Sequence, residues 1–279
     1  MYNLHFLNEK LRIEKYKFVS VLEQIFDQTN LELTTLMRET SNQELNPNVS
    51  VDNVILGFDD DEIKVLLIER QPAGNSNGSL ALPGNLIYDD ETLDQAAKRV
   101  LMELTGISDI YLQQFHTFGD PGRITKKQDI EWLKAVRAHP EARVITVAYF
   151  SLIRIDEYEP TPSAFAKNAI WVPVDEVKSL VFDHNEILNK ALDDVQQKLY
   201  HQPIAFKLLP EKFTLAQLQR VYEIILQTEL DKRNFRRKIL KTGFVLPLDE
   251  KQQGVAHKPA TLYMFDQSKF NGGLKVSHF

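Results

Sequence analysis

The sequence predicts an α/β protein: a mixed β-sheet packed between helices, followed by a C-terminal winged helix-turn-helix domain. Strand-like apolar segments alternate with segments of helical periodicity between residues 49 and 200. Beyond residue 210 the order becomes helix, turn, helix and β-hairpin, as a winged helix requires. The charge also changes there, because residues 203–279 hold 13 Lys and Arg against 7 Asp and Glu, while the whole chain carries −6. We therefore expect three parts, at residues 1–46, 47–202 and 203–279.

The composition excludes several classes of protein. The chain has 279 residues, of which 43% are hydrophobic and 26% charged, a globular rather than a disordered profile. No window of about 18 apolar residues predicts a membrane span, and the N-terminus lacks the pattern of a secretory signal. The absence of cysteine excludes disulfides, thiolate zinc sites and cysteine nucleophiles. We expect a cytoplasmic protein that does not contact a membrane.

Residues 1–46 predict an N-terminal helical extension. Apolar residues at spacings of 7, 4 and 3 share one helical face: Leu11, Phe18, Leu22 and Ile25. The Asn-Pro-Asn sequence at residues 46–48 ends the pattern. This face either packs on the rest of the chain or pairs with a second copy, and we favour packing.

The middle part begins with a predicted β-hairpin. Residues 49–58 and 63–70 are two strands joined by a polar turn. After a loop rich in Gly, Asn and Ser, a helix is expected from about residue 92 to 104, with Gly106 as its C-cap. Further strands are expected at residues 111–118, 144–155 and 168–172, and a further helix at residues 185–200.

Residues 124–143 form an insertion-like segment. Residues 124–134 predict a short helix with an apolar ridge. Two interpretations are open: a lid over a binding site, or an exposed elaboration of a loop. We favour the exposed loop.

The C-terminal part contains a basic helix. Thr214 is the expected N-cap of a first helix, residues 227–230 form the turn, and a second helix follows at about residues 232–241. Phe235 and Ile239 are its expected buried anchor. A basic module on an acidic body is typical of nucleic-acid binding, because Lys and Arg release counterions from phosphates. The alternative is a solvated basic surface.

One motif of the middle part resembles the Nudix box. That family pattern is Gly, five residues, Glu, seven residues, and then Arg-Glu-apolar-any-Glu-Glu-any-Gly-apolar. Asn85 stands at the place of the leading glycine, directly after Gly84. The residues that match the pattern are Glu91, Arg99, Leu101, Glu103, Gly106 and Ile107.

The chemistry of the box is incomplete. Nudix hydrolases cleave nucleoside diphosphate linkages with divalent ions held by clustered glutamates. Val100 and Leu104 stand at two of the three metal-binding positions, which leaves Glu103 alone. We expect no catalytic residue, no metal and no cofactor, with Arg99 paired to Glu91 as a brace. The alternative is an active Nudix hydrolase of a nucleoside diphosphate derivative, with substitute metal ligands at Asp89, Asp90 or Glu131.

A degraded Nudix box ahead of a winged helix resembles the Nudix-related transcriptional regulators of the NrtR/AraR-like family. The resemblance covers about residues 48–265 and is strongest at residues 96–106, 181–184, 213–219 and 230–238. It implies a homodimer on a palindromic double-stranded DNA operator. It also implies a Nudix domain that binds a small-molecule effector without hydrolysing it and so controls operator binding. An ADP-ribose-like nucleotide and a pentose such as arabinose both remain open as effector, as do repression and activation.

The resemblance implies an effector cleft between the sheet and the helix of the box. Arg70 ends its strand beside the loop rich in Gly, Asn and Ser, and its side chain could bind a phosphate or a sugar hydroxyl. Arg123 lies in a loop with Phe118 and Asp120, whose side chains could bind the same groups. Taken singly, each candidate is better explained as a structural or solvent-facing residue, Phe118 and His184 in particular. The candidate effector-binding residues are Arg70, Phe118, Asp120, Arg123 and His184.

In a winged helix the second helix enters the major groove, and the wing contacts the backbone or the minor groove. Arginine can read guanine and asparagine can read adenine, whereas lysines contact phosphates. The candidate base readers are Arg233, Asn234, Arg236 and Arg237. The candidate phosphate contacts are Lys232, Lys238, Lys251 and Lys258.

Overall fold

The computed structural model describes residues 44–59, 62–70, 79–124, 126–161, 166–254 and 258–270. By its internal contacts the chain forms two compact units, Met1–Leu45 with Tyr88–Asp90 and the remaining residues. The predicted helix of residues 1–46 lies almost wholly outside the described ranges. Where they overlap it, Leu45 and Asn46 begin a strand, so the helix prediction is wrong there. No helix within these ranges is long and apolar enough to cross a membrane.

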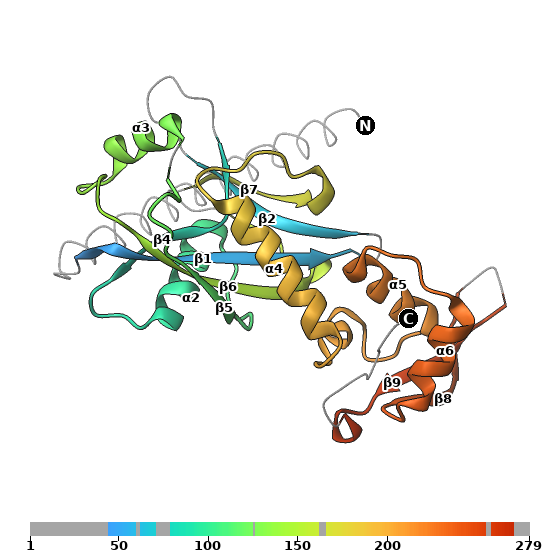
Figure 1. Cartoon of the computed structure of the whole chain (residues 1–279). Helices are drawn as coiled ribbons and strands as arrows, with labels where there is room; N and C mark the ends of the chain where they lie inside the picture. Colours follow the sequence, from blue (N-terminus) through green and yellow to red (C-terminus); the bar gives the residue numbers. More distant parts are fainter. Residues whose placement is uncertain are drawn as a thin grey trace, which may run out of the picture. The chain divides into compact units, whose positions relative to one another are not determined.

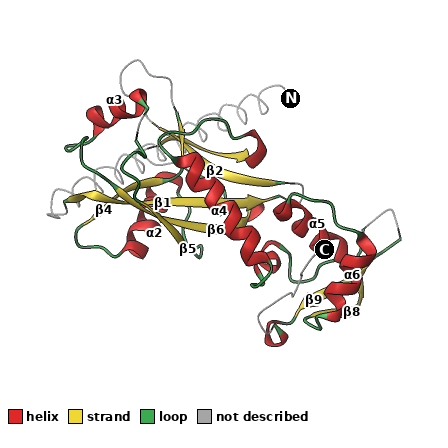
Figure 2. Cartoon of the chain, viewed as in Figure 1, coloured by secondary structure: helices red, strands yellow, loops and turns green. Residues whose placement is uncertain are grey.

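A mixed sheet forms the middle part, as predicted (Figure 1, Figure 2). Its strands are β1 Leu45–Phe58, β2 Ile63–Arg70, β3 Leu80–Ala81, β4 Gly84–Tyr88, β5 Gln113–Phe118, β6 Ile145–Arg154 and β7 Ala166–Pro173. The strand order is β3-β2-β1-β6-β5, with β4 paired to β1 and β7 paired to β2. β1 runs antiparallel to β2 and parallel to β6, which confirms the predicted hairpin and makes the sheet mixed.

The central strand β1 is covered on both faces, which explains its nearly continuous apolar sequence. Residues 51–58 are all buried. Val54, Leu56 and Phe58 pack in a core with the helix α4, His184–Leu199. On the other face, Val51 packs with the helix α2, Leu93–Thr105. The sheet therefore lies between helices.

Local signals determine where α2 begins and ends. Thr92 and Gln95 form a reciprocal capping box at its N-terminus. Gly106 ends the helix at a φ of 71°, a left-handed conformation that glycine adopts without strain. A Cβ at Gly106 would also lie 2.3 Å from the Thr161 hydroxyl oxygen, so the space admits glycine alone. These contacts confirm the helix and the C-cap predicted from the sequence.

The insertion-like segment contains the helix α3, Lys127–Val136. Seven of its ten residues are exposed, as the exposed-loop interpretation predicts, but Leu133 and Asp129 are 1% and 3% exposed and attach the helix to the sheet domain. Asp129 is a charged residue, so its burial requires partners that local periodicity cannot reveal. Short 3-10 turns follow three of the strands: η1 Ile155–Glu157 after β6, η2 Val174–Glu176 after β7, and η4 Gln267–Lys269 after the last described strand.

The C-terminal part has the predicted order of a winged helix. It consists of η3 Ile204–Leu208, α5 Leu215–Leu226, α6 Lys232–Lys241, and the hairpin of β8 Val245–Lys251 and β9 Thr261–Phe265. Phe235 and Ile239 are fully buried, which confirms the predicted anchor of α6. The same hydrophobic core includes residues of α4, and the Gln196 side-chain amide on α4 donates to the Ile225 carbonyl on α5 at 2.9 Å.

Candidate functional site

Buried charged and polar side chains gather around the N-terminus of α4, where the ends of β2, β6 and α3 meet. In an apolar sheet such groups persist only when they are paired, because desolvating a charge is costly. Three pairings organise the cluster, which we define as the polar cluster. Its members are Asp52, Arg70, Arg123, Asp129, Asp183 and His184.

Arg123 and Asp183 form the best-paired contact of the polar cluster. The Arg123 Nε and Nη2 atoms donate to the two carboxylate oxygens of Asp183 at 2.8 and 2.9 Å. The Nη1 atom donates to the Thr146 hydroxyl at 2.6 Å and to the Val144 carbonyl at 3.3 Å. This forked geometry satisfies a guanidinium that is 8% exposed, and it fixes the residue immediately before α4.

His184 is held as a neutral imidazole. Its Nδ1 atom accepts from the Leu82 backbone N–H at 2.9 Å, so the ring proton belongs on Nε2. That Nε2 atom lies 3.6 Å from a carboxylate oxygen of Asp52. Burial lowers the pKa of His184, and the Asp52 charge opposes this effect only in part. Gly84 packs so closely on Asp52 that a Cβ there would lie 1.7 Å from the carboxylate.

Arg70 lies against two aromatic rings. Its guanidinium carbon is 4.0 Å from the centroid of Trp132 on α3 and 4.9 Å from that of Phe182. Nη2 contacts the Asp129 carboxylate at 3.4 Å, and burial lowers the pKa of Arg70. The other Asp129 oxygen accepts from the Phe182 backbone N–H at 2.8 Å. Arg70 is 8% exposed, and its Nε and Nη1 atoms have no hydrogen-bond partner within the described ranges.

The structure brings three of the five predicted effector residues together. Arg70, Arg123 and His184 belong to the polar cluster, and both arginine charges act on His184. Phe118 instead packs in the hydrophobic core, with its ring centroid 6.5 Å from that of Phe115. Asp120 is exposed and accepts from the Gly122 N–H at 2.6 Å, which stabilises a turn.

Sequence reasoning missed several members of the site. Asp52 interrupts an apolar strand, which was the available signal for a buried charge. Arg137 directly follows α3. Burial lowers its pKa, the charge of Asp52 raises it, and the charge of Arg123 lowers it further. The remaining missed residues are Asp129, Trp132, Phe182 and Asp183.

The Nudix-box residues are bound to one another. Arg99 donates from Nε to Glu91 at 2.9 Å and from Nη1 to Glu103 at 3.1 Å. This contact confirms the brace predicted from the sequence. Val100 and Leu104 are 0% and 5% exposed and pack in the core beneath the sheet. Within the described ranges, no group of three or more His, Asp and Glu residues could hold a metal ion.

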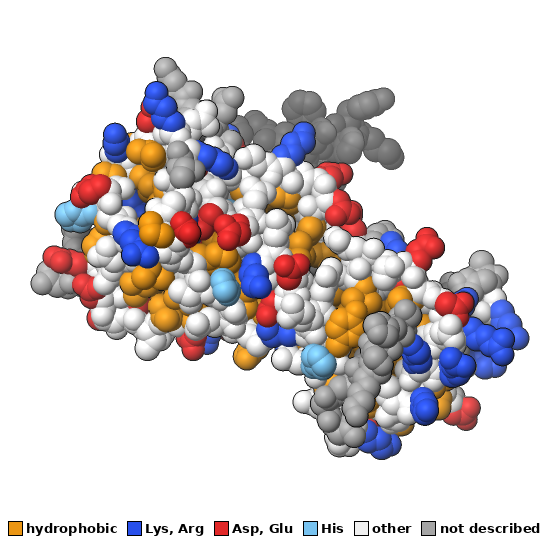
Figure 3. Space-filling view, viewed as in Figure 1, with side chains coloured by type: hydrophobic (Ala, Val, Ile, Leu, Met, Phe, Trp, Pro, Cys, Tyr) orange, Lys and Arg blue, Asp and Glu red, His pale blue; other side chains and the backbone are white. Residues whose placement is uncertain are grey.

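The helix α6 presents a basic surface. Figure 3 shows Lys and Arg side chains gathered in the region of α6. Asp231 caps the helix by accepting from the Asn234 N–H at 2.8 Å, and the Asn234 side chain accepts from Arg237 at 3.0 Å. Most predicted DNA-binding residues are exposed, and only Lys238 is half-buried. The exposed ones are Lys232, Arg233, Asn234, Arg236, Arg237, Lys251 and Lys258.

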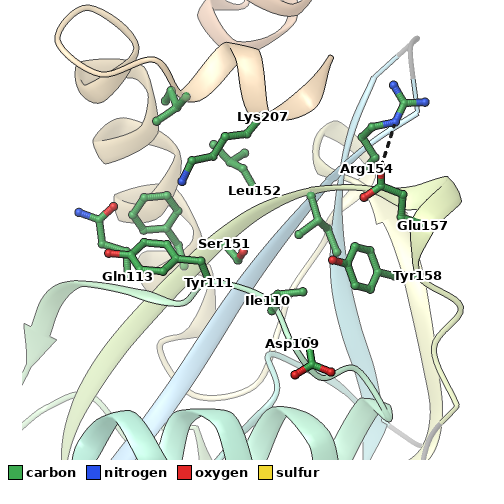
Figure 4. A pocket seen from close by; sticks show the side chains of 13 residues that line it. Asp109, Ile110, Tyr111, Gln113, Ser151, Leu152, Arg154, Glu157, Tyr158 and Lys207 are labelled. Atoms are coloured by element: carbon green, nitrogen blue, oxygen red, sulfur yellow. Dashed lines mark ion pairs between the residues drawn. The ribbon is translucent and has the colours of Figure 1, made fainter. Parts of the chain in front are cut away.

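A separate cavity of about 190 Å³ borders the segment that leads into the winged helix. Figure 4 shows Tyr111 and Tyr158 on opposite sides of it. The Lys207 ammonium group on η3 lies 5.0 Å from the centroid of the Tyr111 ring. This contact attaches the connecting segment to the sheet domain, although none of the predicted effector residues lines the cavity.

Two family models match the chain. The NUDIX domain model matches residues 46–195, and the model of the NrtR DNA-binding winged helix domain matches residues 205–265. A relative from Acinetobacter baylyi, described as an ADPR responsive transcriptional repressor, is 32% identical over 224 residues, which are 78% of this chain and 82% of the relative. An ADP-ribose pyrophosphatase from Methanocaldococcus jannaschii is 26% identical over 144 residues, covering 52% and 72%.

Solved structures agree with this fold. NrtR of Shewanella oneidensis, crystallised with a 27mer DNA, is 26% identical and superimposes with a TM-score of 0.59. The match covers 81% of this chain and 96% of that one. A MutT/nudix family protein from Enterococcus faecalis has a TM-score of 0.60 at 23% identity, covering 88% and 98%, and shows likeness of fold alone.

Proposed function

We infer the function from the family: the chain belongs to the Nudix-related transcriptional regulators of the NrtR type. It is a DNA-binding regulator whose Nudix domain senses a small-molecule effector. The observation that carries this conclusion is the NrtR-type winged helix, whose second helix buries Phe235 and Ile239 and exposes its arginines. Such a surface fits the negative potential of DNA.

We propose an ADP-ribose-like nucleotide as the effector and repression as the response. The repressor from A. baylyi, which is named as ADPR responsive, supports both points. The polar cluster supports the ligand class, because the buried Arg70 guanidinium has two donor atoms, Nε and Nη1, that phosphate oxygens can accept from. Phe182 adds an aromatic face 4.9 Å from that guanidinium. A pentose such as arabinose would leave this charge unused.

We propose that the Nudix domain binds its effector without hydrolysing it. Val100 and Leu104 face the core where metal-binding glutamates are expected, and Glu103 is bound to Arg99. One carboxylate already paired to arginine is a poor site for a hard cation. Incubation with ADP-ribose and magnesium should release no AMP above background. Release proportional to enzyme would instead support the hydrolase function, which the pyrophosphatase relative makes the relevant alternative.

The helix α4 connects the polar cluster to the winged helix. Asp183 and His184 lie at its N-terminus, and Gln196 contacts α5 near its C-terminus. At 1.5 Å per residue, its 16 residues span about 24 Å. A shift of α4 on effector binding would therefore change the packing of α5. This coupling requires the effector to bind the two states with different affinity.

The test of DNA binding is a titration of the full chain against DNA upstream of its own gene at two salt concentrations. Specific binding should weaken with salt and change when ADP-ribose, but not arabinose, is added. Arg236→Ala and Arg237→Ala should each weaken binding by about 1–3 kcal/mol without unfolding the protein. Lys190→Ala, an exposed substitution on α4, is the matched control. Unchanged affinity in both arginine variants would exclude α6 from DNA recognition.

We further propose that the protein binds its operator as a homodimer. Two copies with one α6 each would contact half-sites about 34–36 Å apart on a palindrome. Light scattering can measure the mass of the complex formed on a DNA duplex that contains a single operator, and we expect the mass of two protein copies. A single bound copy would contradict it.

A further inference from the structure

The buried Arg70 guanidinium has fewer hydrogen-bond acceptors than donors. The side chain is 8% exposed, yet it has one carboxylate contact, from Nη2 to Asp129 at 3.4 Å. Its Nε and Nη1 atoms lack partners within the described ranges. A buried donor without an acceptor is unfavourable, so a buried guanidinium with two such donors favours any ligand that brings acceptor oxygens.

Asp129 supplies only part of the acceptor oxygens that such a ligand would bring. One oxygen reaches Arg70 at the long limit of a hydrogen bond, and the other accepts from the Phe182 N–H at 2.8 Å. Because one oxygen contacts Nη2 and the other accepts from the Phe182 N–H, the Asp129 carboxylate cannot also accept hydrogen bonds from the Nε and Nη1 atoms of Arg70. A phosphate has more acceptor oxygens and binds a guanidinium in a bidentate manner.

We propose that Asp129 occupies the place of an anionic phosphate oxygen of the effector, and that the effector displaces it from Arg70. This inference rests on the proposed function, since it concerns the same site. Asp129 lies on α3, so its displacement releases α3 from the sheet domain. α3 is the lid of the effector site, and Asp129 holds it closed in the absence of ligand.

The other contacts of α3 suit a lid. Trp132 covers Arg70, and the Lys126 ammonium group immediately before the helix donates to the Leu180 carbonyl at 2.7 Å. Asp129 also holds the Phe182 backbone, next to Asp183 and the start of α4. Displacing Asp129 therefore frees the segment that precedes α4, the helix that leads to the winged helix.

The first experiment uses Trp132 as a reporter in the full chain. The protein has two tryptophans, so Trp171→Phe leaves Trp132 as the single source of tryptophan emission. Addition of ADP-ribose should shift the Trp132 emission to the red as the ring leaves Arg70. Pyrophosphate should produce the same shift at higher concentration, and ribose should produce none. Calorimetry on the same samples measures binding independently.

The second experiment compares Asp129→Asn with Glu131→Gln, an exposed control that removes the same charge from the same helix. Without the competing carboxylate, Asp129→Asn should bind ADP-ribose at least about fivefold more tightly. Its Trp132 emission without ligand should already resemble that of the liganded protein. Glu131→Gln should match the parent chain in both measurements.

The outcomes separate this proposal from the proposed function. Binding of ADP-ribose with unchanged Trp132 emission, or weaker binding by a folded Asp129→Asn variant, overturns the exchange and leaves the effector in place. A Trp132 shift with pyrophosphate but no binding of ADP-ribose supports the exchange and overturns the effector. If the Asp129→Asn variant does not fold, the Trp132 emission of the Trp171→Phe protein, which retains Asp129, decides whether the exchange occurs. Absence of any shift with either anion overturns the exchange.

Discussion

Replacing Arg123 with methionine should destabilise the sheet domain by about 3–5 kcal/mol, because it leaves the Asp183 carboxylate buried without its partner. The two side chains are 8% and 7% exposed, so solvent does not screen the loss. The substitution also removes the donors to the Thr146 hydroxyl and the Val144 carbonyl. Methionine keeps much of the volume, so a cavity contributes little.

The assay is urea unfolding followed by tryptophan emission. Both tryptophans, Trp132 and Trp171, lie in the sheet domain, so the signal reports on that domain alone. The double variant Arg123→Met with Asp183→Asn should be less destabilised than the sum of the two single variants, with a coupling of about 1–3 kcal/mol. A loss below about 1 kcal/mol for Arg123→Met, or simple additivity, would refute the buried-pair reasoning.

Three further predictions concern stability. Acidification should lower the free energy of unfolding from about pH 6.5 downwards, because burial lowers the pKa of His184 and the unfolded chain then binds a proton that the folded chain does not. His184→Gln should flatten this part of a pH series of urea midpoints. Phe235→Ala should cost the winged helix about 3–5 kcal/mol and abolish operator binding in a gel-shift assay, since its ring is fully buried, with its centroid 5.5 Å from that of Tyr222. Gly84→Ala should cost about 1–3 kcal/mol, because its Cβ would collide with Asp52, and an unchanged thermal midpoint would contradict that contact.

The elements that depend on local signals could be predicted from the sequence. The capping box of α2 and the left-handed Gly106 are determined by neighbours within a few residues, so the pattern alone located the helix. The hairpin of β1 and β2 follows from two apolar runs and a polar turn. In α6, the spacing of Phe235 and Ile239 identified the buried face.

The site could be predicted only in part, because its pairings join residues far apart in the chain. The partner of Arg70 is 59 residues away, and the partner of Arg123 is 60 residues away. Periodicity shows that α3 has an apolar face but not which surface covers it. Asp129 therefore looked exposed although it is buried against Arg70. Phe118 looked like a ligand contact for the same reason, since nothing local distinguishes a core ring from a pocket ring.

The retained and lost parts of the Nudix box follow from one geometric fact. Residues three and four apart share a helix face, so Arg99 and Glu103 contact each other on the part-exposed side of α2, where Glu91 completes the brace. Val100 and Leu104, one position further along, point into the core beneath β1. A glutamate at either position would be buried as a charge unless the sheet opened. Apolar residues there stabilise the domain while the brace keeps α2 in place. We propose that this chain uses the rigid frame to bind a ligand without a metal, so that Arg99, Glu91 and Glu103 serve the frame and Val100 and Leu104 serve the core.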